Sequence, residues 1–196
     1  MEQSIILNNI IRQRRSIKPE NFSNQKVVRE ILDQLLANAN WAPTHAFTEP
    51  WRFVIFAEEG RKRLGEFEAN HYKQKTAAEN FQQKKYDKAL NRPRKATYIL
   101  AICMKRQTEG KKIIAEVEEI AAVSCAIQNM WLTAHAYGLA AYWGSGGATY
   151  SDEMKTFLGL APQDRCLGFF YIGYSQEQPK SRRISNIEAK TTWVTA

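Results

Sequence analysis

The sequence has few of the residues that build metal and disulfide sites. Its three cysteines, Cys103, Cys125 and Cys166, form no CxxC pair, and its three histidines show no zinc-type spacing. An odd number of cysteines, each within an apolar run, argues against a secreted disulfide scaffold. We therefore expect reduced, buried thiols, no metal site and a cytoplasmic protein.

Long hydrophobic segments and the common nucleotide and nucleophile motifs are also missing. The N-terminal stretch has no apolar core of the signal-peptide kind, and the apolar runs near Ile99 and Trp131 are too short or interrupted to cross a bilayer. The patterns GxGxxG, GxxxxGK[ST] and GxSxG do not occur in their required contexts. These absences argue against a membrane protein, a Rossmann or P-loop nucleotide site, and a serine hydrolase.

Acidic residues are too few to balance the basic ones, and the formal net charge is +8. A basic protein attracts anions such as nucleic acids or phosphorylated small molecules. Much of the excess lies between Lys84 and Lys112, in a stretch with few aromatic residues that could stack on bases. We interpret this stretch as a solvated face. A basic nucleic-acid-binding module is kept as an alternative, although no helix-turn-helix, RRM or zinc pattern is present.

The hydrophobic periodicity predicts an α+β fold in which helices pack on a small sheet. Strands are expected at 52–57, 96–104, 139–143 and 166–172. Helices are expected at 4–13, from an N-cap at Ser23 to before Pro43, over 59–90, at 113–137 as the central core helix, and at 152–158 with Ser151 as cap. Gly138 is expected to adopt a positive φ at the end of the long helix.

Four clusters could carry chemistry, although each alone is compatible with an ordinary loop. The basic clusters 14–18 and 178–183 combine arginine or lysine with serine, as phosphate sites do. The glycine-rich turn 143–147 would let the backbone approach a flat ligand closely. The loop 41–51 contains His45, the histidine that we place near a ligand; His71 is expected to be inert, and His135 to be a satisfied core group.

Taken together and in this order, the clusters resemble the flavin-binding nitroreductase family, its shorter bacterial members in particular. Arg14-Arg15-Ser16-Ile17-Lys18 is similar to the family's RRS-x-[RK] signature. The other matching segments are Ala42-Pro43-Thr44-His45, Glu49-Pro50-Trp51-Arg52-Phe53, Trp143-Gly144-Ser145-Gly146, Gly168-Phe169-Phe170-Tyr171-Ile172-Gly173 and Pro179-Lys180-Ser181-Arg182. The resemblance therefore covers nearly the whole chain.

The resemblance implies one nitroreductase-like domain over residues 1–196, with a mostly antiparallel central sheet flanked by helices and a long core helix. It implies a homodimer with FMN at the interface. We further expect a helical cover at about 59–95 and a tail at about 184–196 that is exchanged with the partner subunit.

The resemblance also implies roles for individual residues. Arg14, Arg15 and Ser16 would meet the FMN phosphate and ribityl chain, and Lys180 and Arg182 would complete the phosphate clamp. Lys18 would lie near the N1–O2 edge of the flavin, and Trp143, Gly144, Ser145 and Gly146 would bring backbone against the ring. His45 and Thr48 would come from the partner subunit. Phe47 stands where many members carry an amide, which puts redox tuning and substrate choice in doubt.

The implied activity is ping-pong transfer of hydride from NADH or NADPH, through flavin N5, to a flat, electron-poor acceptor of the nitroaromatic or quinone type. The flavin carries the chemistry, so no certain catalytic side chain is named, and Lys18 supplies charge support. Arg52, Arg92 and Arg94 are candidates for contact with an NADPH 2′-phosphate, and the choice of nucleotide is left open. A flavin-binding sensor or store without turnover is a second alternative.

Overall fold

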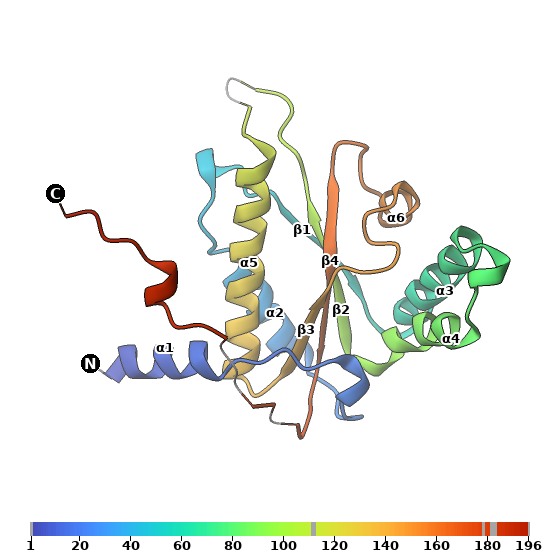
Figure 1. Cartoon of the computed structure of the whole chain (residues 1–196), viewed down its shortest axis with the longest axis horizontal. Helices are drawn as coiled ribbons and strands as arrows, with labels where there is room; N and C mark the ends of the chain where they lie inside the picture. The colour runs from blue at the N-terminus through green and yellow to red at the C-terminus, as the bar shows by residue number, and fades with distance from the viewer. Residues whose placement is uncertain (1, 111–112, 178, 181–183, 196) are drawn as a thin grey trace.

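The computed structural model describes residues 2–110, 113–177, 179–180 and 184–195. Over these residues the chain forms a four-stranded sheet with helices on both faces (Figure 1). The strands are β1 (Trp51–Phe56), β2 (Tyr98–Met104), β3 (Ala140–Gly144) and β4 (Arg165–Gly173). The α-helices are α1 (Glu2–Gln13), α2 (Arg29–Ala39), α3 (Glu58–Lys75), α4 (Gln83–Asn91), α5 (Glu116–Ala136) and α6 (Asp152–Leu158).

The sheet has the strand order β1-β2-β4-β3, and every neighbouring pair is antiparallel. The two central strands are nearly continuous apolar runs, as expected for strands that are buried on both faces. This confirms the predicted α+β fold with an antiparallel sheet. It also leaves β3 at one edge, where a further chain segment can pair with its backbone.

Two hydrophobic clusters cover the two faces of the sheet. On one face α2 and α5 pack through Leu32, Leu35, Ile127 and Met130 against alternate residues of the central strands. On the other face α3 and α6 contribute Leu64, Met154 and Leu158. The predicted long core helix is confirmed, since one side of α5 is fully buried in the first cluster.

The predicted ends of two helices are also confirmed. Gly138 follows α5 with φ 70°, a conformation that favours glycine. Ser151 caps α6, because its Oγ accepts a hydrogen bond from Met154 N at 3.1 Å.

Two expectations were wrong. Ser23 caps no helix: its N–H donates to Tyr174 O at 2.7 Å, and the chain stays non-helical until α2 begins at Arg29. Cys125 is exposed, because it faces away from the sheet on α5, whereas Cys103 and Cys166 are buried opposite each other on β2 and β4. The apolar run therefore predicted the helix, but it did not show which side of the helix packs on the sheet.

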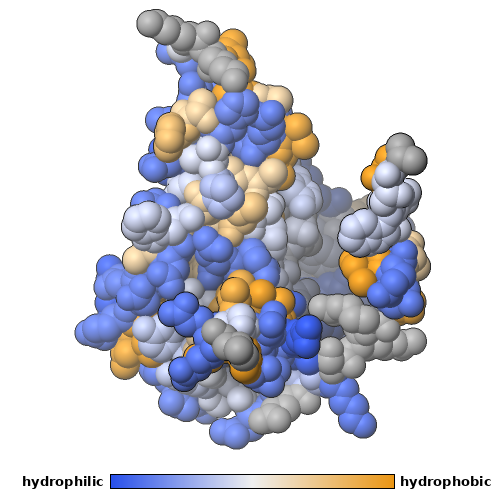
Figure 2. Space-filling model, turned by 90° about the vertical axis from the view of Figure 1, so that its left-hand side faces the viewer, coloured by the Kyte–Doolittle hydropathy of each residue, from blue (hydrophilic) through white to orange (hydrophobic). Residues whose placement is uncertain are grey.

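The chain exposes several large apolar side chains on the side that carries α1, α5 and the C-terminal segment. They are Ile5, Ile6, Leu7, Ile11, Val117, Ile184, Ile187, Trp193 and Val194. Figure 2 shows this side, with hydrophobic patches between charged residues and the C-terminal segment standing off from the body. Among the described residues of that segment the structure has one short 3-10 helix, Glu188–Lys190, and no strand. No helix in the described ranges meets the length and hydropathy needed to cross a membrane.

Candidate functional site

The first basic cluster is fixed beside the edge strand β3. Ile17 N donates to Ala141 O at 3.0 Å, and Ser16 and Ala141 form a parallel bridge. The guanidinium of Arg14 lies 4.3 Å from the centre of the Trp131 ring on α5, where the ring face favours a cation. Ser16 is exposed next to this pair. The segment therefore presents a hydroxyl and a held arginine on the same edge of the sheet.

Arg15 connects the first basic cluster to the second. Its Nε donates to Pro179 O at 3.2 Å, across 164 residues of sequence. Lys180, the next residue, is exposed. Arg182, the other predicted member of the clamp, lies outside the described residues. The structure thus brings the two clusters together at Arg15 and Pro179, which their spacing in the sequence could not show.

His135 lies beside these cations and lines a cavity of about 520 Å³ together with Arg15 and Ile17. It was expected to be a satisfied core group, and this was wrong: the ring is half-buried against the cavity. Burial, followed by the positive charges of Arg14 and Arg15, lowers the pKa of His135. The positive charges of Arg14 and Arg15, which disfavour protonation of His135, also favour a bound anion.

The glycine-rich turn follows directly from β3. Trp143 Nε1 donates to Leu167 O at 3.1 Å, and Thr149 Oγ1 donates to Gly146 O at 2.7 Å, so both ends of the turn are held. Gly168 permits this packing, because a Cβ there would lie 2.5 Å from Trp143 Nε1. Ser145 and Gly146 are exposed. The outer side of the turn is therefore open to a ligand that approaches its backbone.

Lys18 is exposed at the start of a 3-10 helix, Pro19–Asn21, on the way from the basic cluster to α4. Within this 3-10 helix Glu20 forms ion pairs with Lys88 at 3.3 Å and with Arg92 at 3.5 Å. These pairs hold the Lys18 segment against α4 and the 3-10 helix Arg92–Lys95, next to the cleft described below.

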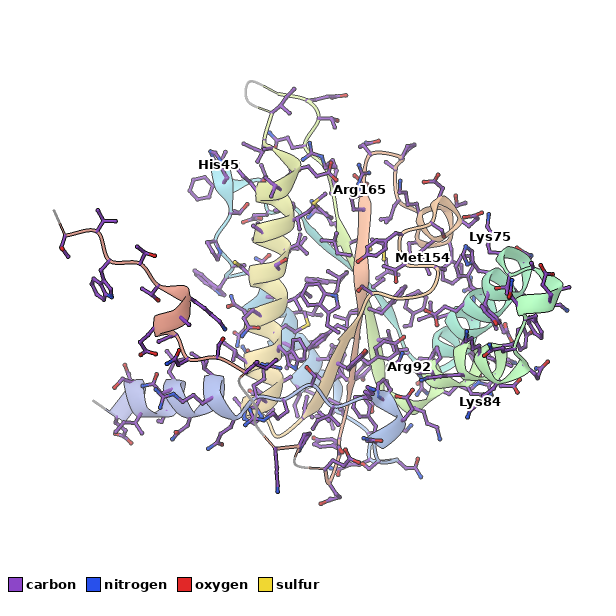
Figure 3. All side chains as sticks on the ribbon, in the orientation of Figure 1. His45, Lys75, Lys84, Arg92, Met154 and Arg165 are labelled. Carbon is purple, nitrogen blue, oxygen red and sulfur yellow. The ribbon has the colours of Figure 1, made fainter. Side chains whose placement is uncertain are left out.

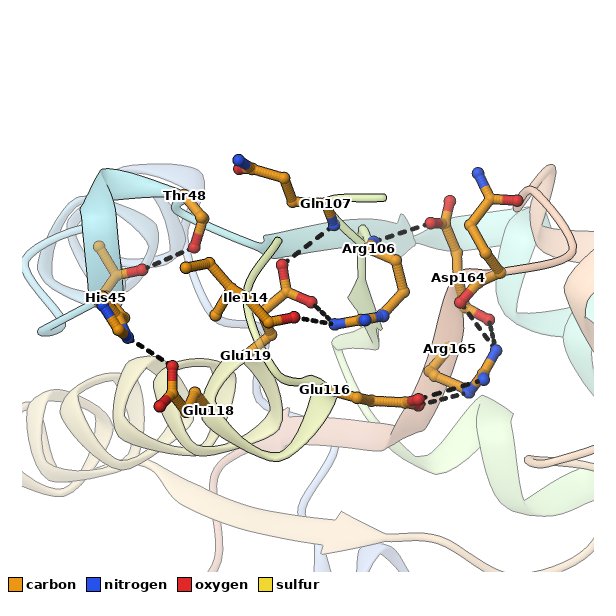
Figure 4. A network of polar contacts seen from close by, with 12 residues as sticks. His45, Thr48, Arg106, Gln107, Ile114, Glu116, Glu118, Glu119, Asp164 and Arg165 are labelled. Atoms are coloured by element: carbon orange, nitrogen blue, oxygen red, sulfur yellow. Dashed lines mark hydrogen bonds and ion pairs between the residues drawn. The ribbon is translucent and has the colours of Figure 1, made fainter. Parts of the chain in front are cut away.

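His45 and Thr48 lie elsewhere, at the N-terminal end of α5 (Figure 4). His45 Nδ1 contacts Glu118 Oε2, and Thr48 Oγ1 lies 3.0 Å from Thr44 Oγ1. Glu118 and Trp131, which mark the two regions, are thirteen residues apart on α5, or roughly 20 Å at 1.5 Å per residue. Within one chain His45 and Thr48 are therefore not brought to the Arg14 cluster.

The loop around His45 is strained and open. Ala46, Phe47 and Glu49 have φ values of 51°, 53° and 42°, in the left-handed region that non-glycine residues rarely adopt. Phe47 is 90% exposed. Backbone strain of this kind is typical of functional loops, and the exposure of Phe47 leaves it free to meet another surface.

A cleft of about 410 Å³ lies between α3, α4 and the glycine-rich turn. Gly144, Gly146 and Gly147 form one wall, and α3 and α4 form the other. Arg92 lies between the sheet and α4 (Figure 3). The remaining polar and aromatic lining includes Glu68, His71, Tyr72, Lys75, Phe169 and Tyr171.

Sequence reasoning did not single out Glu68 or Tyr171. Glu68 is one of several acids on a charged helix, and Tyr171 was assigned only to a strand motif, so neither carried a local signal. Arg92 was considered only for a nucleotide phosphate. Their shared position depends on how α3 and α4 fold over the sheet, which no local pattern encodes.

Comparison with known proteins decides the family. The model of the nitroreductase family matches residues 11–174. The chain belongs to the nitroreductase family. It is 31% identical over 166 residues to the Escherichia coli (strain K12) protein YdjA, covering 85% of this chain and 86% of that protein. It is 29% identical to the Bacillus subtilis (strain 168) protein YfhC, covering 98% of this chain and 96% of that protein. Both relatives carry provisional NAD(P)H nitroreductase names.

Solved structures agree with this assignment. A nitroreductase-like family protein from Bacillus cereus matches with a TM-score of 0.84 at 28% identity, covering 97% of this chain and 96% of that one. A nitroreductase-type protein from Desulfovibrio desulfuricans, solved in complex with FMN, matches with a TM-score of 0.72 at 23% identity, covering 97% and 98%. As a nitroreductase family member, the protein is an oxidoreductase.

Proposed function

We propose that this nitroreductase is an FMN-dependent enzyme that passes hydride from NAD(P)H to a flat, electron-poor acceptor, and that it works as a homodimer. The observation that carries the proposal is the meeting of both basic clusters with the edge strand that leads into the open glycine-rich turn. A phosphate site and a flat-ligand site on one strand are what a flavin mononucleotide requires.

The residues present fit FMN by their chemistry. Arg14, Arg15 and Ser16 offer charge-assisted and hydroxyl donors to a phosphate, and their effect on His135 supports a concentrated positive potential there. Lys180 would add a further cation, since it follows Pro179, the residue bonded to Arg15. Arg182 is assigned to the same clamp from the family resemblance. The turn at 144–147 can approach a ring closely, since an added Cβ at Gly146 or Gly147 would meet nothing within 4 Å.

FMN, when bound, supplies a hydride acceptor and donor that no side chain can provide. The chain's own residues would hold and orient it. The backbone of Trp143, Gly144, Ser145 and Gly146 would face the ring, and the ammonium group of Lys18 would favour negative charge on its pyrimidine edge. Helices α3 and α4 would cover the space in which nucleotide and acceptor bind in turn, which fits a ping-pong order.

The geometry of α5 supports a homodimer. His45 and the Arg14 cluster lie near opposite ends of this helix, so a two-fold pairing with the helices antiparallel would bring His45 and Thr48 of the partner toward Arg14. The exposed apolar residues of α1 and of the C-terminal segment would be covered by the same association, and the tail would be exchanged between subunits. Exposed Phe47 would then lie over the partner's flavin in place of an amide.

Steady-state kinetics test the activity. With NADPH or NADH and a quinone or nitroaromatic acceptor, double-reciprocal plots at several acceptor concentrations are expected to be parallel. Arg14→Met should weaken FMN binding by roughly tenfold to hundredfold, the equivalent of one charge-assisted contact, whereas Arg12→Met, an exposed neighbour on α1, should not. Intersecting lines would contradict the ping-pong order, and equal FMN affinity in the two variants would remove Arg14 from the site.

Sedimentation velocity tests the homodimer at micromolar concentration. The proposal predicts a species of twice the chain mass that retains flavin. A flavin-loaded monomer with full activity would contradict the shared site.

A further inference from the structure

Arg92 occupies an unusual position in the cleft between α3, α4 and the glycine-rich turn. Its guanidinium carbon lies 4.9 Å from the centre of the Tyr142 ring and 5.4 Å from that of the Tyr171 ring. Its side chain is 22% exposed. Two aromatic rings therefore fix the direction of the guanidinium, as in sites where arginine recognises a planar anion.

The fixed guanidinium makes no hydrogen bond to any residue that the structure describes. Its Nε is buried without a hydrogen-bond partner, and its contact with Glu20 at 3.5 Å is an ion pair only. That Nε faces Glu20, so the groups that can donate to a ligand are the two Nη atoms, which are not among the fully buried atoms without a partner. Arg92 lines the cleft, and a ligand there can supply the acceptor for these donors.

The charges around the cleft leave Arg92 poorly neutralised. Glu20 is shared with Lys88, so one carboxylate serves two cations. Lys75 is neutralised by Glu153 at 2.6 Å, whereas Lys85 has no ion pair in the described part of the chain. Glu68 is the only acid that lines the described cleft wall.

At neutral pH the carboxyl group of Glu68 is only partly ionised, so it offsets only part of this positive charge. Burial raises the pKa of its carboxyl to about 7, and Arg92 opposes that rise only in part. The other titratable groups of the cleft are Tyr171 on β4, His71 and Tyr72 on α3, and the cations Lys75, Lys85, Lys88 and Arg92. The cleft therefore becomes more attractive to anions as the pH falls below 7.

The cleft also has surfaces for a flat ring. Phe169 and Tyr171 on β4 and Tyr72 on α3 line it. A volume of about 410 Å³ can hold a substituted single ring. The wall at Gly144–Gly147 is the turn on which we place the flavin, so a ligand here would lie next to the reacting ring.

We infer that Arg92 binds an acidic group, such as a carboxylate, on the aromatic acceptor, and that this nitroreductase prefers acceptors that carry one. The inference rests on the proposed function, because it names the acceptor class of that same site. Arg92 would act as a specificity residue: it anchors the acceptor and takes no part in hydride transfer.

Calorimetry with the purified, oxidised protein tests this inference with benzoate and benzamide, which differ in charge but not in shape. Wild type is expected to bind benzoate roughly tenfold to hundredfold more tightly than benzamide. Arg92→Met should abolish the preference, and Arg92→Lys should keep part of it. Arg94→Met, which changes an exposed arginine on the same 3-10 helix, should leave it unchanged. Circular dichroism checks that each variant is folded.

Two further measurements separate the alternatives. Glu20→Gln in the Arg92→Met background removes the carboxylate that Arg92 had paired with, and the preference for benzoate should still be absent. The ratio of NADPH to NADH affinity should be unaffected by Arg92→Met. A benzoate preference that survives Arg92→Met would overturn the inference, and so would a loss confined to NADPH, which would assign Arg92 to the 2′-phosphate.

Failure of the proposed function would look different. A protein that holds no flavin, or whose flavin NADH and NADPH do not reduce, would contradict the proposed activity. A flavin that is reduced normally, together with equal kcat/KM for 4-nitrobenzoate and 4-nitrobenzamide, would overturn the acceptor class alone.

Discussion

Two half-buried arginines in this protein differ in their hydrogen-bond partners. Arg106, at the N-terminal end of α5, forms an ion pair with Glu119, and its Nη1 also donates to Ile114 O at 3.2 Å. Glu119 is 1% exposed and accepts a second hydrogen bond from Gln107 N at 3.0 Å (Figure 4). Arg92, in the α3–α4 cleft, is held by ring faces and makes no hydrogen bond to the described residues.

The difference separates a charge that is satisfied within the fold from a charge for which we infer a ligand. Around Arg106 both partners are protein groups, and the chain that follows β2 is tied to the start of α5. Around Arg92 the rings set a direction, the ion pair with Glu20 is shared with Lys88, and no hydrogen bond joins the guanidinium to the described residues. We therefore expect changes near Arg106 to act on stability, and changes near Arg92 to act on binding.

Breaking the paired region should have the largest effect. Glu119→Ala leaves Arg106 half-buried without its carboxylate, and the loss of one partner from a buried pair costs about 3–5 kcal/mol. Urea denaturation should show this loss, and Glu119→Gln, which keeps a hydrogen-bond acceptor, should lose less. A loss below about 1 kcal/mol would mean that the pair is solvated and would weaken the comparison.

Neutralising the acid in the cleft should have the opposite sign. The pKa of Glu68 is raised from 4.5 to about 7 in the folded state, so folding favours its protonated form. The destabilisation caused by its ionisation therefore reaches its full size above pH 7 and becomes smaller as the pH falls toward 4.5. Glu68→Gln should stabilise the protein by on the order of 2–3 kcal/mol at pH 8 and by little at pH 4.5.

The matched control is Glu66→Gln, on the exposed side of the same helix. Urea midpoints measured from pH 4.5 to pH 8 should rise with pH for Glu68→Gln relative to wild type and stay flat for Glu66→Gln. Identical curves for the two variants would show that Glu68 titrates as an ordinary surface acid.

The helix cap of α6 depends on a single hydrogen bond, and its loss should have a smaller effect than the loss of the Arg106–Glu119 pair. Ser151→Ala removes the acceptor for Met154 N at the start of α6 and should cost about 1 kcal/mol. Ser23→Ala, at the residue that resembles a cap but begins no helix, should cost less than about half as much. Equal losses in thermal unfolding would contradict the assigned caps.

The smallest effect is expected for an exposed ion pair. Arg29 and Asp33 lie one turn apart on α2, with 68% and 52% of their side chains exposed. Asp33→Asn should cost no more than about 0.5 kcal/mol, because solvent screens the pair. A larger loss in urea denaturation would show that charge pairing matters on the surface as well.

Much of the fold could be predicted because its signals are local. Short apolar runs rich in β-branched and aromatic residues indicated the strands, and the continuous apolar stretch before Gly138 indicated α5. The start of α2 was missed because the backbone N–H of Ser23 is bonded to Tyr174, a residue from the far end of the chain. The exposure of Cys125 was missed because periodicity does not tell which side of a long helix the sheet covers.

The candidate site could be predicted only as separate pieces. The RRS signature and the glycine-rich turn named Arg14, Ser16 and Gly144, and the family resemblance joined them. The link through Arg15 and Pro179 depends on the folded chain. The cleft residue Glu68 became visible only when α3 and α4 were placed over the sheet.

An anaerobic absorption spectrum of the purified protein, recorded before and after addition of NADPH or NADH, tests the central claim most directly. The account predicts a flavin spectrum of about one FMN per chain, since each chain carries one set of the phosphate and ring residues. It further predicts that one of the nucleotides bleaches this spectrum. A flavin that both nucleotides leave oxidised would indicate a sensor or store, and a colourless protein that takes up no added FMN would contradict the flavin site itself.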